Sequence, residues 1–337
     1  MAIQDHPLRY DLANELHTRP FPALEVPCTA VYIAIKRPQE AVGRDRQEDL
    51  DHLIALLDRH GAQHPKPGAT HYSGQIGRHA VKWESHTEFV TYSAFTSSLS
   101  TRAFDPADFE VFPAEWLANA PGVRMASCHI RVQQRPSNDK VQDLLADWFV
   151  PESLAVSTVL EDDAVVAGDF RIDPAGHSRF AVFANETTRE RRVGRVVQRL
   201  CEIETYKSMS MLGFARVGQL AEPLTQMDVQ LTQLMDQLGQ DNTQSETTLT
   251  QLLEASGKLE GMVTRNAFRF GATGAYEAIV NQRIALLREQ RFEGRQTFAE
   301  FMMRRYDPAM RTVKSTERRL ASLADRAIRA GQLLRTR

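Results

Sequence analysis

The hydrophobic positions of this chain follow two different periods, and the change between them occurs near residue 187. Before that point, short apolar runs with strand spacing alternate with short helical patterns. Beyond it, the pattern is almost continuously helical. Because strands repeat every two residues and helices about every 3.6, the chain divides into a mixed head domain at 1–187 and a helical domain at 188–337. The predicted fold class is an α+β (or α/β) head followed by an all-α stalk or bundle.

The head is predicted to contain short strands and helices of ordinary length. The predicted strands are 28–36, 80–95 and 123–133, with more within 153–184, and the predicted helices are 45–60, 113–119 and 138–149. Asn138 is an acceptable N-cap for the last of these helices. Asp173-Pro174-Ala175-Gly176 predicts a turn between two of the later strands.

Three segments of the stalk place apolar residues at alternating spacings of three and four, the pattern of helices that pack side by side. The first seam is Val217, Leu220, Leu224, Met227, Leu231, Leu234 and Leu238. The second is Leu249, Leu252, Ser256, Leu259 and Val263, and the third is Val313, Thr316, Leu320, Leu323, Ala327, Ala330 and Leu334. Pro223 predicts a kink or a restart in the first helix, and the polar residues 239–248 predict a turn. Short interrupted seams favour an antiparallel bundle, and we expect homo-oligomers through the stalk.

Charge is distributed unevenly between the two parts. Residues 1–187 hold 17 basic and 26 acidic side chains, whereas residues 188–337 hold 24 and 17. Such a basic region is typical of a surface that meets phosphates, anionic lipid or an acidic partner, and equally of a solvated arginine-rich helix face. No specific nucleic-acid partner is expected.

Three widely spaced cysteines exclude a disulfide framework and fit a reducing compartment. The N-terminus lacks the features of a signal peptide. No stretch approaches the about 18 apolar residues of a membrane helix, so the chain itself is predicted to be soluble.

The strongest candidate for chemistry is Glu84-x-His86-x-Glu88, within the predicted strand 80–95. A period of two would place all three side chains on one face, where they could ligate a divalent cation or share acid–base work. The alternative is a solvent-facing polar strand edge. No other cofactor is indicated.

Other chemical motifs are missing from the sequence. The histidines between 52 and 79 have no common spacing, and Cys128 and His129 are adjacent on a strand and therefore point to opposite faces. Glycine-rich phosphate loops, a nucleophilic serine elbow and zinc-protease motifs are absent. These observations favour a protein that is not an enzyme.

The segment Glu15-Leu16-His17-Thr18-Arg19-Pro20-Phe21-Pro22 pairs charged side chains with a proline-flanked aromatic ring. It predicts a structural clasp, because proline fixes an extended backbone against a surface. A functional alternative uses His17 and Arg19 to bind an anion.

This segment resembles the opening motif of a bacterial family of predicted membrane-anchored proteins of unknown function, DUF3422. The stretch Val81 to Phe89 (VKWESHTEF) is similar to its second hallmark, and the C-terminal AGQLLRTR resembles the point where family members continue into more helix and a membrane-spanning segment. The resemblance covers essentially the whole chain. Because the family is defined by topology, it assigns no catalytic residues.

The resemblance implies a cytoplasmic location at the bacterial inner membrane, with the basic end of the stalk near the lipid. The membrane-proximal basic face would comprise Arg311, Lys314, Arg318, Arg319, Arg326 and Arg329. We therefore expect a non-enzymatic sensor or interaction head on a self-associating helical stalk. Two alternatives stay open: the cytoplasmic domain of a CorA-like divalent cation channel, which shares this layout, and a metal-dependent enzyme that uses Glu84, His86 and Glu88.

Overall fold

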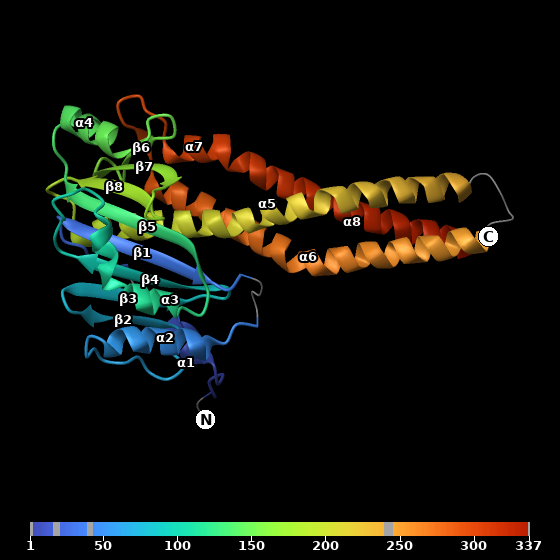
Figure 1. Cartoon of the computed structure of the whole chain (residues 1–337), viewed down its shortest axis with the longest axis horizontal. Helices are drawn as coiled ribbons and strands as arrows, with labels where there is room; N and C mark the ends of the chain where they lie inside the picture. The colour runs from blue at the N-terminus through green and yellow to red at the C-terminus, as the bar shows by residue number, and fades with distance from the viewer. Residues whose placement is uncertain (1–2, 16–20, 39–42, 239–244, 336–337) are drawn as a thin grey trace. The chain divides into compact units, whose positions relative to one another are not determined.

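The computed structural model describes residues 3–15, 21–38, 43–238 and 245–335. The chain forms two compact units, one made of Met1–Thr205 with Arg283–Phe301 and the other of Tyr206–Gln282 with Met302–Arg337. The first unit contains the β-sheet and the second is helical (Figure 1). The predicted α+β head and helical C-terminal part are confirmed.

Nine strands form one mixed sheet in the first unit (Figure 1). Their order across the sheet is β2 (His71–Ile76), β3 (His79–Ser85), β4 (Phe89–Thr96), β1 (Cys28–Lys36), β5 (Val123–Gln134), β8 (Ser178–Ala184), β7 (Ala164–Ile172), β6 (Ala155–Val159) and β9 (Gln290–Arg291). Neighbouring strands are antiparallel except β5 and β8, which are parallel. Parallel strands need a crossover, and this one contains the helix α4 (Asn138–Trp148).

One face of the sheet is covered by short helices that precede or follow its strands. They are α2 (Arg46–Asp58), the 3₁₀ helix η1 (Pro106–Val111) and α3 (Ala114–Ala118). The apolar side of α2, including Leu53 and Leu57, packs on Val31 and Ile33 of β1 and on Trp83 of β3. Asp45 caps α2 by accepting a hydrogen bond from the Gln47 amide. The predicted strand 28–36 and helix 45–60 are thereby confirmed.

The opposite face of the sheet contacts the first turns of α5 (Glu190–Leu238). The Tyr32 hydroxyl lies 2.8 Å from the Thr205 hydroxyl, and Ser178 donates a hydrogen bond to Glu204 over 3.0 Å. This part of α5 is apolar on one side, with Val193, Val197 and other residues fully buried. Because that apolar stripe needs the sheet to cover it, the first unit extends to Thr205, beyond the boundary predicted at 187.

The second unit contains the rest of α5, most of α6 (Ser245–Leu287), the end of α7 (Phe298–Arg305) and α8 (Asp307–Arg335). Ser210 of α5 bonds to the Tyr306 hydroxyl just before α8, and further along both helices Arg319 donates to Asp228. On α6, Thr273 reaches the Ser210 carbonyl. These contacts make α5 and α8 parallel, with α6 running in the opposite direction.

Burial in these helices tests the predicted seams. The first seam is buried from Val217 to Leu234, and the third is buried from Val313 to Ala330 except at Thr316, which is half-buried. The second seam differs in part from the prediction. Leu252 and Leu259 are buried as predicted. At the two positions between and after them, Ala255 and Met262 are buried, whereas the predicted Ser256 and Val263 are half-buried.

One local prediction was wrong. Asn138 is the first residue of α4, and its N-cap is Ser137, whose hydroxyl accepts from the Lys140 amide. Of the kink or restart predicted at Pro223, the restart does not occur, since α5 continues through that residue. Pro223 is exposed, so water can satisfy the helix carbonyl that loses its amide donor.

Candidate functional site

The acidic segment predicted as one strand is a hairpin. Strand β3 ends at Ser85, β4 begins at Phe89, and the His86 amide donates to the Phe89 carbonyl over 2.8 Å. The prediction of a continuous strand 80–95 was therefore wrong. Residues in a turn do not alternate between faces, so the argument that placed Glu84, His86 and Glu88 on a common face does not hold.

Each carboxylate of that segment has a lysine partner instead. Glu84 lies 3.2 Å from Lys82, whose ammonium also donates to Gln198. Glu88 is 1% exposed and lies 3.9 Å from the Lys36 ammonium. Within the described part of the chain, no three His, Cys, Asp or Glu side chains are grouped to hold a metal ion. The structure therefore gives no support to a metal centre here.

The anion-binding pair His17 and Arg19 lies outside the described residues. The proposed role of this pair in anion binding therefore stays a prediction.

The six residues of the predicted basic face all lie on α8, but they differ in their partners. Lys314 donates to Glu277 of α6 over 2.8 Å, and Arg319 and Arg326 both donate to Asp228 of α5. These hydrogen bonds, that of Arg319 most of all, lower the pKa of Asp228. The remaining three, Arg311, Arg318 and Arg329, are exposed. Half of the basic face is therefore neutralised within the bundle.

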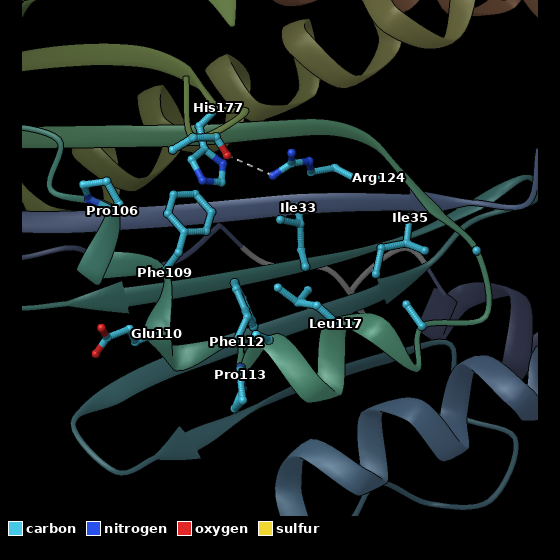
Figure 2. Close-up of a pocket in the computed structure, with 14 residues that line it drawn as sticks. Ile33, Ile35, Pro106, Phe109, Glu110, Phe112, Pro113, Leu117, Arg124 and His177 are labelled. Carbon is cyan, nitrogen blue, oxygen red and sulfur yellow. Dashed lines mark hydrogen bonds between the residues drawn. The ribbon is translucent and has the colours of Figure 1, made fainter. Parts of the chain in front are cut away.

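A cavity with a volume of about 480 Å³ lies against β1, beneath η1 and α3 (Figure 2). That volume is within the range of pockets that hold small organic molecules. Its walls are mostly apolar and come from Ile33, Ile35, Pro106, Phe109, Phe112, Pro113, Ala114, Leu117, Ala120, Gly122 and Ala175. Three polar side chains complete it: Glu110, Arg124 and His177.

His177 forms one wall of the cavity and is fixed on two sides. Its ring stacks on Phe109, and its Nδ1 lies 2.8 Å from the Ser127 hydroxyl. That hydroxyl donates its only proton to the Tyr32 carbonyl, so Nδ1 must be the donor to Ser127. Burial, and after it the positive charge of nearby Arg124, lowers the pKa of His177 to about 4. His177 is therefore an uncharged wall residue at neutral pH.

Arg124 lies at the same end of the cavity as His177 (Figure 2). Its guanidinium is exposed, and its one protein hydrogen bond among the described residues is a long one, 3.5 Å to the Ala175 carbonyl. A Cβ on Gly176 would lie 2.0 Å from Nη2 of Arg124, so the arginine can lie against this turn only because residue 176 is glycine. Glu110 is at the end of the cavity away from Arg124 (Figure 2).

A smaller polar cavity of about 200 Å³ lies near the other end of β1 and includes Ser100 and Asp108. Asp108 accepts from Ser100 and lies 2.9 Å from Nε2 of His129. Although burial raises the pKa of Asp108, the hydrogen bonds from His129 and Ser100 lower it more. Serine, histidine and aspartate are the residue types of a catalytic triad. Here the carboxylate bonds to both partners, so the histidine does not lie between the serine and the carboxylate as it does in a triad.

The model of the family described as "Protein of unknown function (DUF3422)" matches residues 4–337. The chain belongs to this family. No curated protein and no solved structure matches it. In this DUF3422 member, none of the helices built from the described residues is long and apolar enough to span a bilayer.

Sequence analysis missed the polar residues of this cavity, Glu110, Arg124 and His177. Arg124 and His177 are far apart in the sequence and meet because β5 pairs with β8. One local signal was available: the predicted turn at 173–176 is immediately followed by His177, and its glycine has φ +91°. A histidine that follows such a turn and begins a buried strand is a candidate for a fixed, functional position.

Proposed function

We propose that the sheet-containing unit is a non-enzymatic sensor head that binds a small amphipathic molecule in the cavity beneath η1 and α3. The observation that carries this proposal is the make-up of the cavity. An apolar wall built on Ile33 and Phe112 ends at two fixed polar groups, Arg124 and His177. Binding sites for small organic molecules commonly combine an apolar surface with a few polar groups that set the ligand's orientation.

The same residues argue against catalysis in this cavity. Its described lining contains no serine, threonine, cysteine, lysine or tyrosine that could act as a nucleophile. His177 donates through Nδ1 to Ser127 and is fixed against Phe109. Recognition without chemistry is the role that fits these groups best.

The test is binding of simple amphipathic probes, octanol and octanoate, to the full chain by saturation-transfer NMR. We expect at least one of them to bind the wild type. Ala114→Trp, which places a large ring at the cavity, should abolish binding. Ala118→Trp is the matched control, because Ala118 is also exposed on α3 but does not line the cavity. If neither probe binds, or if both variants behave alike, the proposal fails.

For the helical unit, we propose self-association and an approach to anionic lipid on the cytoplasmic side of the inner membrane, as the family resemblance implies. The exposed residues Arg311, Arg318 and Arg329 support it, because no carboxylate among the described residues pairs with them. Co-sedimentation with phosphatidylglycerol vesicles should weaken when all three become Gln, and neutral vesicles should not bind. Equal binding to both vesicle types would contradict an electrostatic approach.

The CorA-like channel alternative stays a prediction, as does the metal-dependent enzyme. Light scattering of the full chain with and without Mg²⁺ separates them from the sensor. Five subunits would favour the channel, and a melting temperature raised by divalent cations would favour the metal enzyme. A cation-independent monomer or dimer is the result expected for the sensor.

A further inference from the structure

We propose that the ligand of this cavity is a monocarboxylate with an apolar body, whose carboxylate binds Arg124 and whose body lies along Ile33, Ile35 and Leu117. This inference rests on the proposed function and specifies its ligand class. It follows from the charges at the two ends of the cavity and from the apolar surface between them.

Arg124 supplies the positive end. A guanidinium presents a planar fork of donors that matches the two oxygens of a carboxylate. In this structure the Arg124 guanidinium lies against the turn at Gly176. Its one hydrogen bond among the described residues is to the Ala175 carbonyl, at 3.5 Å. No described carboxylate lies in ion-pair contact with Arg124. An anionic ligand could therefore bind Arg124 without displacing a carboxylate of the described residues.

The other polar groups of the cavity limit how many negative charges a ligand can carry. His177 is fixed to Ser127 as an uncharged ring and adds no second positive charge beside Arg124. At the far end, Glu110 would repel a second carboxylate (Figure 2). One anionic group fits this arrangement, whereas a dicarboxylate or a doubly charged phosphate ester does not.

The apolar body is indicated by the surface between those ends. Leu117 is 39% exposed although it lines the cavity, and the Phe112 ring beside it is 2% exposed. An aliphatic chain that covers Leu117 would remove apolar surface from water, which favours binding. A charged or strongly hydrated ligand body would gain no such binding free energy from covering Leu117.

Isothermal titration of the full chain with four eight-carbon probes tests this inference. They are octanoate, octanol, octylammonium and the dicarboxylate suberate. We expect octanoate to bind about tenfold more tightly than the other three, since a charge-assisted hydrogen bond contributes that much. Arg124→Gln should remove the preference for octanoate over octanol. Arg102→Gln, an exposed arginine that does not line the cavity, should retain it.

The outcomes separate the two proposals. If octanol binds as tightly as octanoate, the ligand class is wrong but the sensor cavity stands. If suberate binds best, or if Arg124→Gln keeps the preference, the assignment of Arg124 as anchor is overturned. If none of the probes binds, the proposed function fails as well. Unchanged melting temperatures show that both variants are folded.

Discussion

The imidazole of His177 lies flat against the phenyl ring of Phe109, with ring centroids 3.6 Å apart and planes 10° from parallel. This contact joins η1 to the residue that precedes β8, and both rings line the cavity beneath η1 and α3. Burial disfavours the charged form of this ring, whereas the hydrogen bond from Nδ1 to Ser127 fixes its orientation. Protonation would place a charge beside Arg124 in a buried position.

The pKa of His177 predicts how the stability of the head depends on pH. The value of about 4 in the folded chain lies below the ordinary 6.5, so the unfolded chain binds more protons between these two values. The free energy of unfolding therefore falls as the pH decreases from about 6.5 to 4, by roughly 3 kcal/mol from this group. Urea denaturation of the wild type and of His177→Asn at several pH values measures this pH dependence of the unfolding free energy.

The matched control is His60→Asn, at an exposed histidine. His177→Asn should lose part of the pH dependence, whereas His60→Asn should keep the wild-type profile. Identical profiles for wild type and His177→Asn would show that the ring titrates normally.

Gly176→Ala should weaken ligand binding by displacing Arg124. The φ of +91° at residue 176 is strained for alanine, and the new Cβ would lie 2.0 Å from Nη2 of Arg124. Gly77→Ala has a positive φ of +52° but no atom within 4 Å, so it isolates the backbone cost. Both should lose about 1 kcal/mol of stability, but only Gly176→Ala should lower octanoate affinity. Equal affinities would mean that Arg124 does not depend on this turn.

The buried pair Lys36 and Glu88 should be structural and independent of metal ions. Lys36 is 5% exposed and Glu88 is 1% exposed, so Glu88→Gln would leave a buried ammonium without its carboxylate. We expect a loss of roughly 3 kcal/mol in unfolding free energy. The loss should be the same with EDTA and with Mg²⁺ or Zn²⁺. A loss seen only with a metal present would restore a metal site at this hairpin.

The sequence predicted elements well wherever one period continued over a whole segment. Strand β1 is one continuous apolar run, and α2 has helical spacing with the N-cap Asp45 before it. In both cases the local sequence is sufficient to predict the element. The hairpin at 86–88 was missed because His86-Thr87-Glu88 contains none of the glycine, proline or asparagine residues that mark turns.

The candidate site could be predicted far less well than the fold. Arg124 belongs to β5 and His177 immediately precedes β8, so only the pairing of these two strands brings them together. Local spacing carries no information about such pairing. Ala255 and Ser256 illustrate the same limit in the helices, because the choice between two adjacent small residues depends on the partner helix.

Two glycines of α5 should respond in opposite ways to the same substitution. A Cβ on Gly213 would lie 2.2 Å from the Thr273 hydroxyl of α6, and Thr273 is 2% exposed and cannot move away freely. Gly213→Ala should therefore destabilise the helical unit by about 1–3 kcal/mol. Gly218, five residues later, has no atom within 4 Å. Gly218→Ala should stabilise α5 by about 0.5–1 kcal/mol, since alanine loses less backbone entropy in a helix. Thermal unfolding followed at 222 nm compares the two, and a stabilising Gly213→Ala would show that α5 and α6 are not in close contact at this point.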